Sequence, residues 1–405
     1  MKCNWITKKL SEIAIINPRE SLGKGVVAKK VPMDKLQPFC RDIPEFVLEE
    51  YKGGTKFRKD DTIMARITPC LENGKIAKVS VLSDGEVGFG STEYIVFRAI
   101  DGVSDADFLY YLICSPLVRN PAIKSMVGSS GRQRVQTDVV ASLNIELPPI
   151  EEQRKIGGLL KSLDDKIELN NQINNNLEQQ AKAIFKSWFV DFEPFGGVQP
   201  SEMQFIPLQE LCKVVTKGTT PTTLGKLFTS SGINFIKAES ILDNHSIDSS
   251  KFAFVDEETN ALLKRSVIKA NDIIFTIAGT LGRFAMVDNS VLPANTNQAV
   301  AIIRPDEAKI TPAYLYSFFI GNWHNEYYSK RIQQAVQANL SLTTIKSLPI
   351  AVLNNTTMSN YDKLVSPLFA LMKNNEEENR RLSKLRDALL PKLMSGELDV
   401  SDIDI

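Results

Sequence analysis

Two long segments with apolar residues at alternating spacings of four and three constrain this chain more strongly than any other feature of its sequence. The first opens after Pro149 and continues to about Trp188, and the second runs from about Tyr361 to Leu390. Such spacing is typical of a coiled-coil seam. The expected seam positions are Ile156, Leu160, Leu163, Ile167, Asn170, Asn174, Leu177, Ala181, Ile184 and Trp188 in the first helix, and Tyr361, Leu364, Leu368, Leu371, Asn375, Glu378, Leu382, Leu385 and Leu389 in the second.

Polar residues interrupt both seams near the middle of each helix. Asparagine at a core position commonly fixes the register and the number of partner helices. Asn170, Asn174 and Asn375 therefore favour pairing of the two helices with each other. An antiparallel pair would hold the segments that precede the helices roughly 50 Å apart, at 1.5 Å per residue. As an upper bound, this is about 15 base pairs of B-DNA.

The segments that precede the two helices resemble each other. Phe57–Ile67 and Val267–Ile277 are both strand-like runs after an acidic turn, and Gly74–Val79 matches Gly282–Val287. The other matched pairs are Ser91–Arg98 with Asn295–Arg304 and Phe108–Ile113 with Tyr314–Phe319. We expect an α+β fold class, with two similar globular recognition modules joined by two long antiparallel coiled-coil helices in a pseudo-symmetric arrangement. The expected boundaries are 1–150 for the first module, 151–195 for the first helix, 196–355 for the second module and 356–405 for the second helix and tail.

Length and composition describe a globular protein with two cores. The chain has 405 residues, of which 43% are hydrophobic and 24% charged. No stretch approaches the roughly 18 apolar residues of a membrane span, and the N-terminus does not resemble a signal peptide. The five cysteines are widely spaced, which favours buried thiols in a reducing compartment. We therefore expect a cytoplasmic protein.

The charged residues balance overall but not locally. Lys plus Arg and Asp plus Glu both number 48, so no net field attracts the chain to phosphate. However, residues 108–137 contain no acidic side chain and four basic ones. Residues 327–361 also contain no acidic side chain, and they contain three basic ones. A single acid-free stretch is commonly a solvated surface. Two acid-free stretches at equivalent places in the repeat favour nucleic-acid contacts.

Four segments resemble the conserved regions of a known family. They are Leu147–Ile156 (LPPIEEQRKI), Leu163–Asn170 (LDDKIELN), Ala183–Phe192 (AIFKSWFVDF) and Leu389–Leu398 (LLPKLMSGEL). Together they resemble the specificity subunit of type I restriction-modification systems, and the resemblance covers the whole chain in order. One departure is that the second helix follows Leu348–Leu353 without the Pro-Glu-Glu-Gln-Arg continuation.

The resemblance implies a division of labour. It implies that the subunit performs no chemistry, that each recognition domain reads one half of a split asymmetric DNA target, and that the helices set the gap. It also implies docking of two adenine-methylating modification subunits, which use S-adenosylmethionine, and restriction subunits, which use ATP and Mg²⁺. These cofactors are expected on the partners and none on this chain. Partner subunits would supply much of the phosphate contact, which accounts for the neutral net charge.

Motifs of catalysis are missing from the sequence. It has no N-P-P-Y-like or D-P-P-Y-like methylation motif, and Gly218–Leu227 has the wrong glycine spacing for a phosphate-binding loop. His245 and His324 have no second ligand at metal spacing. The rival hypotheses are a stand-alone methyltransferase or nuclease, a coiled-coil adaptor that binds no nucleic acid, and a specificity subunit whose partner fuses cleavage and methylation.

Candidate DNA contacts are donors on loops at the matched positions. Arginine can fork onto guanine, and glutamine or asparagine can pair with adenine. The candidates in the first module are Arg66, Lys75, Arg132, Gln133 and Arg134. Those in the second are Arg283, Asn295, Asn297, Gln298, Gln337 and Asn339, with Thr219 and Thr220 as candidates for phosphate. Because amides more often cap turns and helices, a structural role stays open for each of them.

Overall fold

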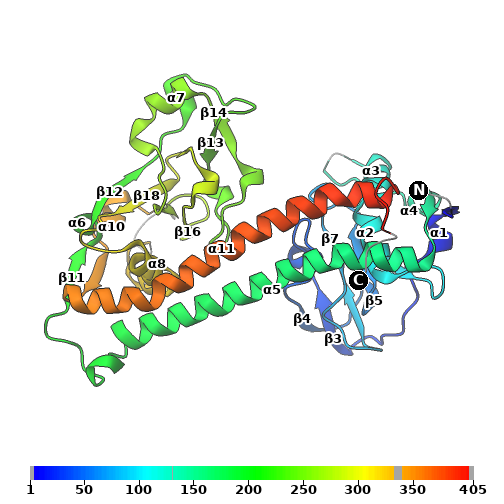
Figure 1. The fold of residues 1–405 in the computed structure, drawn as a ribbon, viewed down its shortest axis with the longest axis horizontal. Helices are drawn as coiled ribbons and strands as arrows, with labels where there is room; N and C mark the ends of the chain where they lie inside the picture. Colours follow the sequence, from blue (N-terminus) through cyan, green and yellow to red (C-terminus); the bar gives the residue numbers. More distant parts are fainter. Residues whose placement is uncertain (1–3, 130, 333–339, 401–405) are drawn as a thin grey trace. The chain divides into compact units, whose positions relative to one another are not determined.

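The computed structural model describes residues 4–129, 131–332 and 340–400. The chain divides into two compact units (Figure 1). Unit 1 comprises Met1–Asn171 and Glu376–Ile405, and unit 2 comprises Gln172–Asn375. Each long helix therefore contributes residues to both units. The four consecutive domains expected from the sequence stay a prediction.

Unit 1 is built around a four-stranded sheet of order β2-β9-β6-β7. Its strands are β2 (Ala14–Ile16), β9 (Tyr94–Ala99), β6 (Thr62–Ala65) and β7 (Ile76–Lys78). A second sheet of order β4-β3-β8-β5 contains β4 (Val47–Glu50), β3 (Val27–Val31), β8 (Val87–Gly90) and β5 (Thr55–Arg58), and β1 (Ile6–Lys9) pairs with β10 (Asn144–Leu147). Strands β6 and β9 are buried along most of their length, so they form the centre of the hydrophobic core.

The helices of unit 1 pack around the sheet β2-β9-β6-β7. They are α1 (Leu10–Ile13), α2 (Ala106–Cys114), α3 (Pro116–Lys124), α4 (Thr137–Ala141), a 3-10 turn η1 (Met33–Lys35) and the first half of α5 (Ile150–Phe189). Helix α2 begins where the Asp105 carboxylate accepts the amides of Asp107 and Phe108, both at 3.0 Å. Its apolar run Phe108–Ile113 is buried against β6, β7 and β9. The match with Tyr314–Phe319 predicted this helix correctly.

Unit 2 repeats the topology. The sheet β12-β18-β15-β16 corresponds to β2-β9-β6-β7, the sheet β14-β13-β17 to β4-β3-β8, and the pair β11-β19 to β1-β10. The strands are β11 (Gln204–Pro207), β12 (Cys212–Lys217), β13 (Ile233–Ile236), β14 (Ala253–Val255), β15 (Ile273–Thr276), β16 (Phe284–Met286), β17 (Ala294–Thr296), β18 (Val300–Pro305) and β19 (Pro349–Val352). Both units contain one parallel pair, β3 with β8 and β13 with β17. The repeat expected from the sequence is confirmed.

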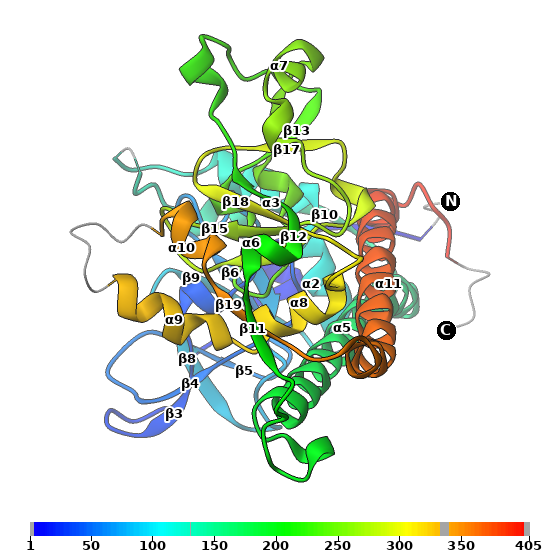
Figure 2. The same cartoon turned by 90° about the vertical axis from the view of Figure 1, so that its left-hand side faces the viewer.

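The helices of unit 2 follow the same order. They are α6 (Leu208–Leu211), α7 (Glu257–Leu262), α8 (Pro312–Ile320), α9 (Trp323–Ile332), α10 (Leu342–Lys346) and the first half of α11 (Asn355–Met394), with 3-10 turns η2 (Glu193–Phe195), η3 (Pro221–Leu224), η4 (Ala238–Ser240), η5 (Ser249–Lys251), η6 (Lys264–Ser266) and η7 (Asn289–Val291). Figure 2 shows β13, β17 and α7 together at the top, beyond the central strands β15 and β18. Helix α8, in contrast, is buried in the core that also contains Phe185, Phe189 and Tyr361 of the long helices.

An ion pair between a half-buried arginine and a buried carboxylate recurs in the two units. Arg98 on β9 and Arg304 on β18 each bind a carboxylate through Nε and Nη2, both at 2.7 Å. The acceptors, Asp61 and Asp272, lie in the acidic turns that the sequence aligned, and they are at most 1% exposed. The repeat therefore preserves side-chain contacts as well as strand order.

The long helices run antiparallel within each unit. In unit 1, Asp164 and Asn170 of α5 contact Arg386 and Asn379 of α11. In unit 2, Asn174 accepts a 2.7 Å hydrogen bond from Asn375. Asparagines of the two helices therefore hydrogen-bond across the seam, in agreement with the pairing that their positions favoured. The antiparallel coiled-coil pair and the α+β fold class are confirmed.

The expected seam is wrong at several positions. Leu364, Leu371 and Leu385 are 46%, 45% and 48% exposed, and Met372 and Arg386 face inward in place of the last two. Ile184 and Trp188 are only partly buried, whereas Phe185 and Phe189 are buried. A strict heptad drifts relative to a helix of 3.6 residues per turn, and here the helices also pack on a globular core. Ile156, Leu160, Leu177, Ala181 and Tyr361 are buried as expected, Asn170 and Asn375 are buried polar residues, and Leu163, Ile167, Asn174, Leu368, Glu378, Leu382 and Leu389 are half-buried.

Candidate nucleic-acid interface

Three candidate or neighbouring side chains meet in unit 1 where β6 ends and β9 begins. Arg66 follows β6, and its amide donates a 2.9 Å hydrogen bond to the carbonyl of Glu93, which precedes β9. Arg134 comes from a distant loop that forms isolated bridges with Ile67 and Val127. We call Arg66, Glu93 and Arg134 the arginine cluster.

The Glu93 carboxylate holds the arginine cluster together. Arg134 donates to it from Nε at 3.0 Å to both oxygens and from Nη2 at 2.6 Å. The Nε of Arg66 lies 3.8 Å from the same carboxylate. The hydrogen bonds from Arg134 lower the pKa of Glu93, so this residue stays ionised. Two guanidinium groups around one carboxylate leave a net positive charge at this edge of the sheet.

The other candidates of unit 1 lie near the arginine cluster with different environments. Arg132 is exposed at the tip of the loop. Gln133 is half-buried, and its backbone exchanges hydrogen bonds with Thr68 at 3.0 and 3.1 Å. Lys75 donates from Nζ to the carbonyl of Met33 at 2.8 Å. The ammonium of Lys75 is therefore engaged within the fold, while Arg132 and Arg134 face solvent.

Unit 2 brings together polar side chains at the corresponding turn before β18. The Thr220 hydroxyl hydrogen-bonds to the exposed Gln298, and Arg265 donates from Nη2 to Thr219 at 3.2 Å. Gly218 allows this approach, because a Cβ at this position would lie 1.9 Å from the carbonyl oxygen of Thr296. We call Thr219, Thr220, Arg265 and Gln298 the hydroxyl–amide cluster.

Several candidates of unit 2 have structural roles. Asn295 is fully buried and donates to Asn260 at 2.8 Å, so the prediction that it contacts a base is wrong. All three residues of β17 are buried, so this strand has no face open to DNA. Asn297 accepts the amide of Ala299 at 3.1 Å, as a turn residue does. Arg283 binds Asp243 through Nε and Nη2, both at 2.7 Å. Gln337 and Asn339 lie outside the described residues.

The two clusters lie at the equivalent turns before β9 and β18, but they are built from different positions of the repeat. The amide of Arg66 donates to Glu93, and the amide of Ile277 donates to Ala299 at 2.8 Å. The next residue pair also matches, since Val135 donates to the Arg66 carbonyl as Leu340 does to that of Ile277. Unit 2 therefore has apolar residues where unit 1 has Arg66 and Glu93. One scaffold presents two different surfaces.

Comparison with known protein families explains this duplication. The family described as "Type I restriction modification DNA specificity domain" matches residues 4–179 and 200–354, more than half of the chain. The chain belongs to this family. Its members are the specificity subunits of type I restriction-modification systems, so the resemblance noted in the sequence is confirmed.

Relatives of this specificity subunit match over most of their length. The HindI specificity subunit of Haemophilus influenzae is 26% identical over 415 residues, which cover 84% of this chain and 87% of the relative. The MjaIX specificity subunit of Methanocaldococcus jannaschii is 27% identical over 318 residues, 75% of this chain and 71% of that protein. A crystallised S subunit from M. genitalium is 16% identical, covers 96% of both chains and has a TM-score of 0.58. That structure has the same fold.

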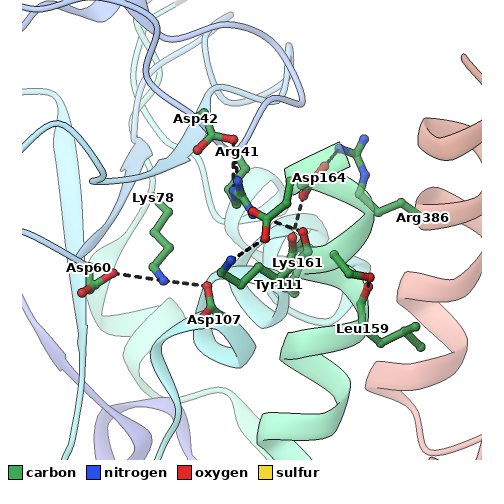
Figure 3. Close-up of polar contacts among 12 residues, drawn as sticks. Arg41, Asp42, Asp60, Lys78, Asp107, Tyr111, Leu159, Lys161, Asp164 and Arg386 are labelled. Carbon is green, nitrogen blue, oxygen red and sulfur yellow. Dashed lines mark hydrogen bonds and ion pairs between the residues drawn. The ribbon is translucent and has the colours of Figure 1, made fainter. Parts of the chain in front are cut away.

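A third polar cluster in the specificity subunit was not foreseen from the sequence. Figure 3 shows Asp164 of α5 between Tyr111 of α2 and Arg386 of α11. The Tyr111 hydroxyl and Arg386 Nη1 each donate to this carboxylate at 2.6 Å. Burial, followed by the charge of Asp164, raises the pKa of Tyr111, which keeps its proton.

Among the helices of the described residues, none is long and apolar enough to cross a membrane.

Glu93, Arg265 and Asp164 are the residues that sequence reasoning missed. Glu93 stood inside a matched segment, but a search for donors passes over acids. Arg265 precedes the strand-like run Val267–Ile277, and its contact with Thr219 joins distant parts of the chain. Asp164 could have been found from its place in the heptad segment, because a carboxylate on the apolar face of a helix requires a buried partner.

Proposed function

We propose that this specificity subunit reads a split asymmetric DNA target, with one half-site for each unit. The observation that supports this proposal is the pair of clusters at equivalent turns of a repeated fold. The arginine cluster offers guanidinium groups, whereas the hydroxyl–amide cluster offers Thr220 and Gln298. Bases are distinguished by their donors and acceptors, so different side chains on one scaffold suit two different half-sites.

The partners follow from the family as part of the proposal. Two modification subunits dock on the conserved helices and methylate adenine with S-adenosylmethionine. Restriction subunits add translocation and cleavage that use ATP and Mg²⁺. These subunits supply much of the phosphate contact, and the recognition clusters supply base readout. In a variant of this proposal, a single partner subunit combines cleavage and methylation.

A selection from random duplexes tests the split target. The full chain is co-purified with its modification subunit and incubated with a random double-stranded library, and bound duplexes are sequenced. We expect two short specified blocks separated by a fixed unspecified gap. A single uninterrupted site would contradict the split target, and absence of any enrichment with the partner present would favour an adaptor that binds no nucleic acid. Binding of S-adenosylmethionine by the isolated chain would favour a stand-alone methyltransferase.

A further inference from the structure

Arg134 belongs to a surface loop, but its backbone is fixed by hydrogen bonds. It exchanges backbone hydrogen bonds with Val127 at 2.9 and 3.1 Å. The next residue, Val135, is buried and donates to the carbonyl of Arg66 at 2.8 Å. Little conformational entropy would be lost when such a side chain binds a ligand, because its backbone is already fixed.

The hydrogen bonds of Arg134 occupy one edge of its guanidinium. A guanidinium has five N–H donors in a planar fork. Nε and one N–H of Nη2 bind Glu93, whereas Nη1 has no partner among the residues that the structure describes. The side chain is 46% exposed. The edge formed by Nη1 and Nη2 is therefore directed away from Glu93 and open to a planar acceptor pair.

Other arginines near the clusters lack this combination. Arg283 uses Nε and Nη2 on Asp243, and its Nη1 donates to the carbonyl of Ile241 at 3.3 Å. Arg98 binds Asp61 and also Glu20, at 2.6 Å through Nη1. The Nε of Arg66 is buried without a hydrogen bond among the described residues. Arg134 alone of these four combines exposure, a carboxylate brace and an open bidentate edge.

We propose that Arg134 reads a guanine in the half-site of unit 1, with Glu93 as the positioning residue that orients its guanidinium. The O6 and N7 acceptors of guanine in the major groove match two parallel N–H donors of arginine. This inference rests on the proposed function, because it names the base that one cluster recognises. Unit 2 has Ala299 in the place of Glu93, so the inference applies to one half-site only.

The experiment uses the full chain with its modification subunit and the random duplex library. The wild-type target should contain a guanine in one block for which enrichment over other bases is about 10- to 100-fold. Arg134→Ala should remove that preference and leave the other block unchanged. Arg134→Lys keeps the charge and can still donate to guanine but loses the planar fork, so it should bind DNA with a weakened guanine preference.

Glu93→Gln tests the positioning role. This variant should weaken the preference for the same guanine, and it should have no additional effect in the Arg134→Ala background, since it acts through Arg134. Lys59→Ala is the matched control, because Lys59 forms an exposed ion pair with Asp84 at 2.8 Å and precedes β6, at the end away from the cluster. It should leave both blocks unchanged.

Several outcomes would overturn the proposal. They are a wild-type target without guanine in either block, guanine preference retained in Arg134→Ala, or loss of both blocks in Arg134→Lys. If Arg134 contacted phosphate instead, Arg134→Ala would weaken binding uniformly across sequences and reduce its salt dependence. If the wild-type complex selects no split target at all, the proposed function fails before the role of Arg134 is reached.

Discussion

Arg386 of α11 donates a 2.6 Å hydrogen bond from Nη1 to the carboxylate of Asp164 on α5. The two side chains are 11% and 4% exposed, so the ion pair is largely removed from water. Tyr111 donates to the second oxygen of the same carboxylate. Helix α2 and both long helices are thus joined at one point in unit 1, which fixes how α5 and α11 pair there.

Asp164→Ala should destabilise unit 1 by about 3 kcal/mol, because it leaves a buried guanidinium without its main counterion. Thermal unfolding monitored by circular dichroism measures the loss. The double variant Asp164→Leu with Arg386→Met should be more stable than Asp164→Ala, since apolar residues replace both charges. Glu151→Ala removes an exposed ion pair with Arg154 and should change little. Equal effects of the buried and exposed substitutions would contradict this interpretation.

The repeated ion pairs should differ in strength between the units. Asp272→Ala leaves Arg304 with the Val267 carbonyl as its remaining partner among the described residues, and we expect a loss of about 3 kcal/mol in unit 2. Asp61→Ala should cost unit 1 less, because Arg98 keeps Glu20. Hydrogen exchange read by mass spectrometry locates each loss, with the other unit as internal control. A larger effect of Asp61→Ala would show that Glu20 does not compensate.

Sequence patterns determined the order of elements more reliably than the helix faces. The matched turns before β6 and β15 were predictable because Asp61 and Asp272 stand at the same distance from similar apolar strands. The faces of the helices were not, because an isolated heptad pattern assumes a single partner helix. For Phe185 and Phe189 the sequence left open a partner subunit or the second module, and both side chains pack on Tyr314 in the core of unit 2. The burial of these two side chains depends on residues of unit 2 that lie outside the helix, so the helix sequence alone does not predict it.

The candidate site was predictable in its donors and not in their partners. Arg134 and Arg66 stood out as basic residues on loops, but Glu93, which binds Arg134, lies 41 positions away in the sequence. Asn295 has the donor and acceptor groups that a base contact needs, but its side chain is buried. Every residue of β17 is buried, and the sequence of so short a strand does not show which of its faces other elements cover.

Lowering the pH should weaken unit 2 through His324. This side chain is fully buried among Phe275, Phe319 and Tyr328, and neither ring nitrogen has a hydrogen-bond partner among the described residues. Burial lowers its pKa from 6.5 to about 3. Below pH 6.5, His324 therefore binds a proton in the unfolded chain but stays neutral in the folded chain. The free energy of unfolding falls as the pH drops toward 3. From pH 7.5 to 5.5 we expect a loss of about 1 kcal/mol.

The control for this pH dependence is His324→Leu, which is similar in volume and cannot ionise. Thermal unfolding of this variant should lose most of the dependence between pH 7.5 and 5.5. His245, whose pKa is also lowered by burial, contributes in the same direction. His245→Asn suits the left-handed backbone at this position, where φ is 64°, and should retain the part due to His324. An unchanged pH profile in His324→Leu would assign the effect elsewhere.

Deleting one heptad from each long helix should shorten the gap between the half-sites. Residues 167–173 of α5 and 376–382 of α11 lie between the Asp164–Arg386 and Asn174–Asn375 contacts, so their removal spares both contacts. Seven residues of helix span roughly 10 Å, about three base pairs of B-DNA. Selection from the random library should therefore return the same two blocks with a gap about three base pairs shorter, because the recognition clusters are untouched. Insertion of one heptad at the same place should lengthen the gap equally, whereas altered blocks or an unchanged gap would contradict a spacer role for the helices.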